Sequence, residues 1–495
     1  MQEIFTLGQK QFLSGIGPSS HLSDRGVFLK ARGLNMFVDY FAESENLGIF
    51  QTCGTPTQIG SSVMVDAWLA ATVRVAGSNS GSLFAIGEAG HLYSLDLQNS
   101  ILTDIRPDLI GGAGNNTATG ISIYKPQDST EYLYYFLKTA IGRWDLINTV
   151  AGGGFQDAWE TGLENTLHHP NHFFKGDIFF GNKNMIGRIY NISGSGATVA
   201  TTAVGLALTL AADFTVTCID DDGDYLIAGI TKNAVASNLR ADTRIIFWDT
   251  VSQKFNKEWL LPDPTIIGIK KFEEGHLAFG SRGIYYFSIG RKPKRLKNFG
   301  TGQALGVGFP FAVDYLGDGL LWGGGDTYLN FYGKLIADVP RAYFQPFYGS
   351  SGQATYVNSI DVVNKVLVAT AAPALYSFTL SDSGSTSSAQ IETIYFDLKG
   401  EWNVELADII LAEPLAVGDS MTLQYQTDED TAAADFGTIA YDANLDDPVP
   451  RRRIQLSPGN QIQATHLKYL FNPTAGNVKI KSITTYGTPI RGLES

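Results

Sequence analysis

Short apolar and aromatic runs separated by polar turns follow one another along most of the chain. The clearest example is Ile267–Gly290, where we predict strands at Ile267–Phe272, His276–Phe279 and Ile284–Ile289. Runs of β-branched and aromatic residues bounded by Gly-containing polar turns are typical of β-strands. We interpret this stretch as the outer hairpin of one β-propeller blade, with the strand that leads into it.

The same order of turn, apolar run, Gly, turn and aromatic strand occurs about seven times. The copies are Asn79–Leu97, Asp128–Ile147, Lys175–Ile192, Asp221–Thr250, Ile267–Gly290, Leu316–Gly333 and Val363–Leu380. The aligned residue is Gly in five copies and Leu137 or Thr370 in the other two; the glycines are Gly87, Gly181, Gly229, Gly280 and Gly323. Aligned positions are about 43 to 51 residues apart, a period typical of four-stranded propeller blades. A recurrent Gly indicates a positive φ or a close backbone approach. A β-sandwich series with coincidental spacing is the alternative.

These patterns predict an all-β chain with three parts. Residues 1–60 do not fit the repeat and are expected to form an arm against neighbouring subunits or a strand that closes the ring, because an open propeller exposes sheet edges. Residues 61–385 are expected to form a propeller of about seven blades. After the Ser- and Gly-rich linker Ser381–Gln390, residues 391–495 are expected to form a β-sandwich of jelly-roll type. Its strands are predicted at Ile391–Leu398, Leu406–Leu411, Ser420–Gln426, Arg452–Leu456, Ala464–Phe471 and Val478–Tyr486, with an acidic loop at Thr427–Asp447.

Composition limits the cellular compartment and the classes of partner that we expect for the protein. The chain has 495 residues, a net charge of −13 and a charged fraction of 17%. The net negative charge argues against a general grip on nucleic acid, which needs clustered cations, and the low charged fraction favours contact with other subunits. The two cysteines imply no disulfide framework. We expect no secretory leader, and we read the apolar stretch Ala197–Ile219 as strands rather than a membrane span.

Two polar clusters have a chemical and a structural interpretation. The acidic turn Asp220–Asp224 has the composition of a calcium loop but lacks the distal Glu that such loops use, so we favour a solvated turn. His168, His169 and His172 lie together in "LHHPNHFF". Because closeness in sequence is not coordination geometry, we interpret them as a loop or blade-edge cluster and predict no metal ligands.

Two segments are the candidate partner contacts. A basic run contains Arg291, Lys292, Lys294, Arg295 and Lys297. It is either a dock for an acidic partner or for DNA phosphate, or an exposed, solubilising loop between blades. The stretch Arg341–Tyr356 is expected to be an exposed aromatic loop with Tyr343, Phe344, Phe347 and Tyr348 as contact residues. Aromatic groups elsewhere are expected to pack between blades.

No catalytic or cofactor-binding residue is predicted. The sequence contains no GxSxG, HExxH or P-loop motif, so a nucleophilic, zinc-protease or nucleotide-binding centre is not indicated. Trp-Asp pairs at Trp144–Asp145 and Trp248–Asp249 occur in two copies, which does not support a WD40 protein. A pair of carboxylates for glycoside hydrolysis stays open, because the two acids can come from distant loops. We expect a protein that is not an enzyme.

Both ends of the chain resemble structural proteins of tailed bacteriophage virions. The resemblance lies in "GIGPSSHLSDRGVFLKARGLNMF" near the start, and in "IETIYFDLKG", "LADIILAEPLAVGDSMTLQYQTDED", "HLKYLFNP" and "VKIKSITTYGTP" near the end. It implies a tail, tail-tip or connector component that is made in the host cytoplasm and joins other virion proteins, as a homo-oligomeric ring or in multiple copies around a symmetric tail.

Two functions follow as hypotheses. The first is a non-enzymatic virion component that docks other proteins through complementary surfaces. The second is a propeller that binds or cleaves carbohydrate during recognition of a host receptor, for which acids and exposed aromatics should converge at the channel mouth. Fold alone does not separate the two.

Overall fold

All regular elements in the described parts of the computed structural model are β-strands. The structure describes residues 2–8, 29–32, 57–58, 68–69, 83–86, 92–96, 101–106, 118–125, 131–149, 151–166, 168–191, 197–200, 207–232, 242–298, 313–316, 319–323, 328–333, 341–346, 348–349, 352–353, 357–363, 366–371, 374–379, 390–393, 395–411, 414–442, 451–456, 461–475 and 480–490. The protein is therefore all-β, as the sequence predicts. No helix within these ranges is long and apolar enough to cross a membrane.

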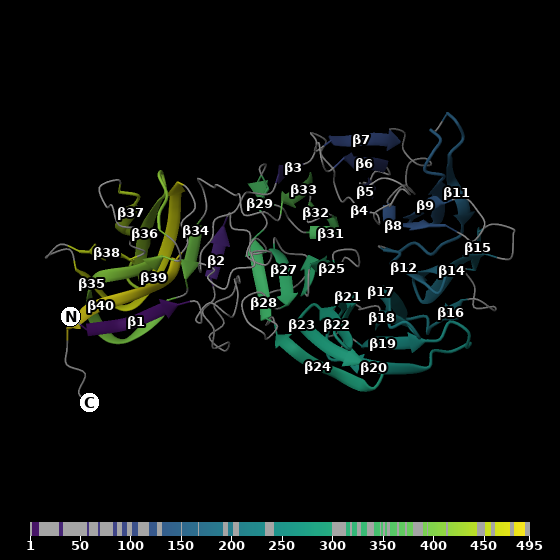
Figure 1. The fold of residues 1–495 in the computed structure, drawn as a ribbon. Coiled ribbons are helices and arrows are strands. Elements are labelled where there is room, and N and C mark those ends of the chain that lie inside the picture. The colour runs from purple at the N-terminus through teal and green to yellow at the C-terminus, as the bar shows by residue number, and fades with distance from the viewer. Residues whose placement is uncertain are drawn as a thin grey trace.

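Seven small antiparallel sheets follow one another along the chain (Figure 1). The first sheet contains β4 (Trp68–Leu69), β5 (Leu83–Ile86), β6 (Leu92–Asp96) and β7 (Ile101–Arg106). The second contains β8 (Ala118–Tyr124), β9 (Tyr132–Leu137), β10 (Ala140–Trp144) and β11 (Phe155–Thr161). The third contains β12 (Asn171–Phe174), β13 (Asp177–Asn182), β14 (Met185–Asn191) and β15 (Ala197–Ala200), with β16 (Leu208–Thr209) beside β14. The fourth and fifth are β17 (Phe214–Asp221), β18 (Leu226–Lys232), β19 (Thr243–Trp248) and β20 (Lys257–Leu261); and β21 (Ile266–Phe272), β22 (Gly275–Gly280), β23 (Gly283–Ser288) and β24 (Arg291–Asn298).

The last two sheets have the same size, but the seventh takes one strand from far upstream. The sixth contains β25 (Val313–Leu316), β26 (Gly319–Gly323), β27 (Tyr328–Gly333) and β28 (Arg341–Pro346). The seventh contains β31 (Val357–Val363), β32 (Val366–Ala371) and β33 (Ala374–Thr379), with β3 (Thr57–Gln58) antiparallel to β33. A separate pair is formed by β29 (Tyr348–Gly349) and β30 (Gly352–Gln353).

The recurrent hairpin of the sequence is the central pair of strands in each sheet. In the fifth sheet it is β22 and β23, flanked by β21 and β24. The interpretation of this hairpin as the outer one is wrong, because a fourth strand pairs with it on the far side. That fourth strand is the basic run Arg291–Lys297, which was expected as a loop; it pairs with β23 through two register shifts instead.

Two of the recurrent glycines, Gly181 and Gly229, allow neighbouring sheets to approach closely. A Cβ on Gly229 would lie 2.5 Å from Cys218 Sγ of the adjacent strand and 2.7 Å from Ile266 Cγ2 of the next sheet. A Cβ on Gly181 would lie 2.9 Å from Val216 Cγ1, again in the next sheet. These separations are below ordinary van der Waals contact, so close approach rather than a positive φ explains the Gly at these positions.

The core of this region lies between consecutive sheets. Five clusters of buried side chains each join one sheet to the next in sequence, from the β4–β7 sheet to the β25–β28 sheet. The Phe179 and Trp248 rings meet edge to face with centroids 5.9 Å apart, and the Phe279 and Trp322 centroids are 5.0 Å apart. Aromatic pairs of this kind add to the burial of apolar area. The aromatic strands Tyr132–Phe136 and Tyr285–Phe287 also contribute buried rings to these clusters, so the aromatic residues pack between consecutive sheets.

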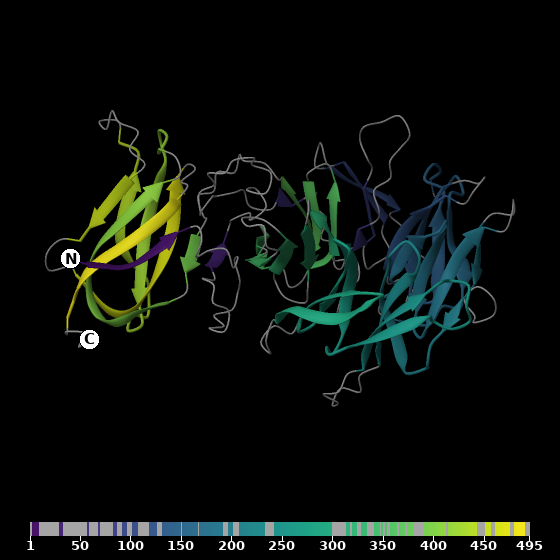
Figure 2. The same cartoon turned by 60° about the horizontal axis from the view of Figure 1, so that its bottom comes forward.

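Each small sheet also contacts the next one along the chain, through its first or second strand. Contacts join β4 to β8, β8 to β12, β13 to β17, β17 to β21, β21 to β25, β25 to β31, and β31 back to β4. Figure 2 shows these sheets gathered in one part of the molecule, away from the strands that contain both chain ends.

The strands near the two chain ends share one nine-stranded sheet. Its members are β1 (Gln2–Gly8), β2 (Leu29–Arg32), β34 (Gln390–Thr393), β35 (Phe396–Leu411), β36 (Ser420–Thr427), β37 (Ala434–Ala440), β38 (Arg451–Gln455), β39 (Ile462–Ala475) and β40 (Ile480–Pro489). β1 pairs with β40 and β2 pairs with β34. Described strands of residues 1–60 therefore belong partly to this sheet and partly, through β3, to the seventh small sheet.

A long strand organises this nine-stranded sheet. β35 has 16 residues and pairs with β39 in its first half and with β38 and β40 in its second. Lys399 has a φ of 55° at an irregularity in its pairing with β39. Tyr469 is buried in the core of this sheet, and its hydroxyl lies 2.8 Å from Thr485 Oγ1. The predicted acidic loop Thr427–Asp447 is partly a strand, since β37 pairs with β36.

Candidate functional site

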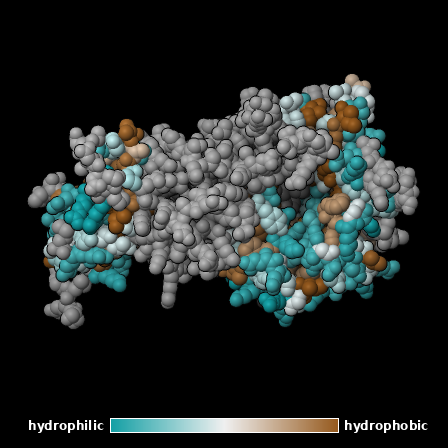
Figure 3. All heavy atoms as spheres, viewed as in Figure 1, coloured by the Kyte–Doolittle hydropathy of each residue, from teal (hydrophilic) through white to brown (hydrophobic). Residues whose placement is uncertain are grey.

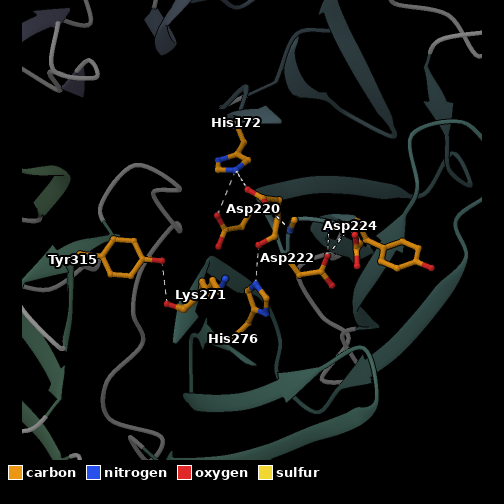
Figure 4. Close-up of polar contacts among 10 residues, drawn as sticks. His172, Asp220, Asp222, Asp224, Lys271, His276 and Tyr315 are labelled. Atoms are coloured by element: carbon orange, nitrogen blue, oxygen red, sulfur yellow. Dashed lines mark hydrogen bonds and ion pairs between the residues drawn. The ribbon is translucent and has the colours of Figure 1, made fainter. Parts of the chain in front are cut away.

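The first strand of the third small sheet and the first strand of the fourth bring a histidine and two aspartates together (Figure 4). His172 lies on β12, and Asp220 and Asp221 end β17 of the next sheet. His172 Nε2 is 2.6 Å from Asp221 Oδ2 and 3.7 Å from Asp220 Oδ1. One nitrogen or oxygen atom from each residue can be chosen so that all three lie within 4.8 Å of one another. One imidazole and two carboxylates are a donor set for a divalent cation.

The repeat places these residues side by side. His172 is paired with Phe179, two residues before Gly181, and Asp220 is paired with Ile227, two residues before Gly229. His172 and Asp220 therefore occupy equivalent positions in adjacent sheets. Because the first strands of these sheets are neighbours, equivalent positions come together although about one repeat length separates them in sequence.

Asp220 is the most buried member of the cluster. It is 5% exposed, and its Oδ2 atom has no hydrogen-bond partner within the part of the chain that the structure describes. Asp221 is half-buried, and the hydrogen bond from His172 lowers the pKa of its carboxyl group against the opposing effect of burial. A buried carboxylate without a full set of partners is costly.

Other strands surround the cluster. His276 on β22 is 3% exposed, and its Nε2 donates to the Asp221 carbonyl oxygen at 2.8 Å. Tyr315 on β25 is 44% exposed and donates its hydroxyl to the Lys271 carbonyl oxygen at 3.0 Å. Burial, followed by the negative charge of Asp220, raises the pKa of Tyr315. Figure 4 shows Tyr315 on the side of the cluster away from the turn.

The turn after β17 has the structure expected of a solvated turn. Asp222 Oδ1 accepts from the amides of Asp224 and Tyr225, and Asp221 Oδ1 accepts from the Gly223 amide. Gly223 has a φ of 93°, which favours glycine. The interpretation as a turn therefore fits Asp222 to Asp224 but not Asp220, which is buried at the strand end.

The three histidines of "LHHPNHFF" do not gather at one point. His169 is fully buried, and its Nδ1 lies 2.7 Å from the Gly181 carbonyl oxygen. Burial lowers the pKa of His169, and it lowers the pKa of His168 to about 4. His172 instead faces the next sheet. Sequence proximity grouped the wrong residues, and the aspartates that His172 meets are 48 and 49 residues downstream.

The basic run lies on the fourth strand of the fifth sheet. Arg291, Lys292, Lys294 and Arg295 are exposed on β24, whereas the Lys297 side chain lies outside the described residues. Arg295 donates to the Tyr285 hydroxyl at 3.2 Å and to the Pro262 carbonyl oxygen at 3.3 Å. For the other three, the described part of the structure contains no ion pair. Figure 3 shows a mainly hydrophilic surface in this region, with isolated hydrophobic residues.

The expected aromatic loop contains strands. Tyr343 and Phe344 lie on β28, which pairs with β27, and Tyr348 lies on β29. Phe347 and the side chains of the other three residues lie outside what the structure describes. Their role as partner contacts stays a prediction.

Two Trp-Asp pairs share one turn design. Asp249 Oδ1 accepts from the Val251 and Ser252 amides, and Trp248 Nε1 donates to the Ser252 carbonyl oxygen at 2.7 Å. Asp145 and Trp144 make the corresponding contacts. These residues stabilise the turns between third and fourth strands, a structural role.

Comparisons with known proteins do not assign a family. No protein-family model matches the chain, and no curated protein matches it. Among solved structures, the chain is similar to a computationally designed protein, Ika8, at 11% identity and a TM-score of 0.36, over 65% of this chain and 100% of that one. A TM-score this low does not establish a common fold.

Proposed function

We propose that the seven small sheets form a closed seven-bladed β-propeller and that the nine-stranded sheet forms a sandwich of jelly-roll type. The cyclic order of contacts, from β4 through the successive sheets to β31 and back to β4, supports closure. The pairing of β3 with β33 supports it as well, because a strand from before the first blade completes the last one. Closure of this kind removes the exposed edges that an open ring would leave.

We further propose that the protein is a non-enzymatic structural component of a tailed-bacteriophage virion, where the ring serves as a rigid docking scaffold for other virion proteins. The single observation that carries a docking role is the exposed basic strand β24. Arg291, Lys292 and Lys294 are cations on an acidic chain, and the described residues offer them no anionic partner. Charge complementarity therefore favours an acidic protein surface as the partner of this strand.

The fourth-strand position suits such a contact. β24 pairs with β23 on one side and forms no ladder with another described strand. It presents cations to solvent, and charged side chains on an outer strand also discourage uncontrolled strand addition. The same strand can therefore protect the sheet edge and select an acidic partner.

Charge reversal tests this proposal. The chain is supplied in trans to a phage whose own copy is interrupted, with Arg291, Lys292 and Lys294 all changed to Glu. We expect purified particles to contain much less of this variant than of the wild type, because attraction to the acidic surface becomes repulsion. Arg295 is left unchanged because it bonds to Tyr285.

The matched control changes the exposed Lys125, Lys254 and Lys399 to Glu, an equal change in charge at other places. It should enter particles normally. Normal incorporation of the β24 variant would contradict docking through this strand, and absence of the wild-type chain from particles would contradict a virion role.

Carbohydrate recognition is the second candidate, favoured by one observation. The half-exposed Tyr315 lies beside the Asp220–Asp221 pair near the first strands, a combination of aromatic ring and acids that can bind sugar. The two carboxylates come from adjacent residues, share one histidine and have oxygen atoms within 4.8 Å of each other, closer than the pair of acids in a retaining glycosidase (about 5–5.5 Å) or an inverting one (about 6.5–9.5 Å). The site therefore favours binding over cleavage. A glycan array in which Tyr315→Ala binds as wild type, or in which neither binds, would contradict this role.

A further inference from the structure

We propose that His172, Asp220 and Asp221 bind a divalent transition-metal ion, such as Zn²⁺, that joins two neighbouring sheets. The ligand atoms would be His172 Nε2 and one carboxylate oxygen from each aspartate. The site is independent of the docking strand β24, and it requires neither enzymatic activity nor a virion.

The buried carboxylate of Asp220 is the first argument. Its Oδ2 atom lacks a hydrogen-bond partner among the described residues, and its one ion pair there is with His172 at 3.7 Å. Asp221 adds a second carboxylate at the same imidazole. Two adjacent acids with one shared imidazole leave excess negative charge at a buried position, which a bound cation would neutralise.

The spacing of the donor atoms is the second argument. Around a tetrahedral ion with bonds of about 2.1 Å, neighbouring donors lie about 3.4 Å apart. His172 Nε2 is 2.6 Å from one carboxylate oxygen and 3.7 Å from the other. These two separations differ from the tetrahedral value by less than about 1 Å. The two carboxylate oxygens lie within 4.8 Å of each other, so the aspartate side chains would rotate towards a bound ion.

The surroundings hold the ligands in place. His276 fixes the end of β17 by donating to the Asp221 carbonyl oxygen, and the Gly223 amide donates to Asp221 Oδ1. The free oxygen for the metal is therefore Asp221 Oδ2, the atom that now meets His172. Contacts of this kind orient metal ligands.

The donor types select the class of ion. An imidazole nitrogen with two carboxylate oxygens suits Zn²⁺ and similar transition metals, whereas Ca²⁺ and Mg²⁺ prefer a shell of oxygens alone. Three protein ligands leave at least one position for water. Because His172 comes from β12 and the aspartates come from β17, the ion would connect two successive sheets and stabilise their contact.

The test measures Zn²⁺ binding to the untagged full chain by calorimetry after treatment with a chelator. We expect about one ion per chain, and at least a tenfold loss of affinity in Asp220→Asn and in His172→Gln. Asp224→Asn is the matched control, because its exposed carboxylate belongs to the same turn and is not a ligand. His466→Gln removes an exposed His-Asp pair elsewhere and should also leave this ion bound.

Thermal unfolding supplies a second readout. Zn²⁺ should raise the unfolding temperature of the wild type and of Asp224→Asn, but not that of Asp220→Asn. Without metal, Asp220→Asn should be at least as stable as the wild type, because it replaces a buried charge with a neutral group of the same shape. Equal Zn²⁺ affinity in Asp220→Asn, a stronger response to Ca²⁺ than to Zn²⁺, or no binding by the folded wild type would overturn the proposal.

Discussion

Replacement of Gly229 with Ala tests how closely the fourth and fifth sheets approach. The added methyl group would lie 2.5 Å from Cys218 Sγ, 2.7 Å from Ile266 Cγ2 and 3.1 Å from Ile266 Cδ1. Cys218 and Ile266 are both buried in the cluster that joins these sheets. Neither side chain can turn into solvent, so the backbones must separate or the side chains must leave their rotamers.

The expected cost follows from two opposing effects. Overpacking of a tight core lowers the free energy of unfolding by about 1–3 kcal/mol. Replacement of Gly with Ala raises it by about 0.4–1 kcal/mol, because Ala reduces the conformational entropy of the unfolded chain. We expect a net loss of about 1–2 kcal/mol in the free energy of unfolding. Cys218→Ala removes the nearest atom, so in a double-mutant cycle Gly229→Ala should cost less in the Cys218→Ala background.

Urea unfolding followed by tryptophan fluorescence measures this cost. Gly290→Ala is the control, since its Cβ would meet nothing nearer than Ser288 Oγ at 4.0 Å. This control should be within about 0.5 kcal/mol of the wild type. If Gly229→Ala behaves like Gly290→Ala, the sheets do not pack as closely as described.

Two further predictions concern pH and turns. Burial lowers the pKa of His168 from 6.5 to about 4, so the unfolded chain binds more protons between these values. The free energy of unfolding should therefore be highest above about pH 6.5 and should fall as the pH drops towards 4. This histidine alone should lower it by about 2 kcal/mol at pH 5. A His168→Gln variant whose stability depends on pH as steeply as that of the wild type would contradict the assignment. Asp249→Ala removes acceptors for the Val251 and Ser252 amides and should cost about 1 kcal/mol in urea unfolding, whereas Asp224→Ala should cost less than half of that.

The repeat was predictable because local sequence carries it. Each hairpin has its own turns and alternation, and Gly181 and Gly229 mark the same close approach to the next sheet. The fourth strand was harder to predict, because Arg291 to Lys297 has the composition of a solvated loop and pairs with β23 alone among the described strands. β37 was missed for a similar reason, since its acidic surroundings conceal an alternating strand.

The cluster of His172, Asp220 and Asp221 could not be predicted from residues that are close in sequence. Its members are 48 and 49 residues apart and meet because two sheets pack against each other. Alignment of the first strands to the recurrent Gly would have placed His172 and Asp220 at equivalent positions. The burial of Asp220, which distinguishes it from Asp222 in the turn, could not be predicted from composition.

The rigid scaffold that we propose depends on closure of the ring through β3. Gln58 is opposite Tyr376, and Thr57 is opposite Ser377, in the β3–β33 pair. Cysteines at positions 58 and 376 should therefore form a disulfide in the folded full chain, because opposed residues lie within bonding distance on one face. Cysteines at 58 and 377 face opposite sides and should not. Formation of the 58–376 disulfide, detected by peptide mass spectrometry and accompanied by a higher unfolding temperature, is the predicted result; equal crosslinking of both pairs, or of neither, would contradict closure.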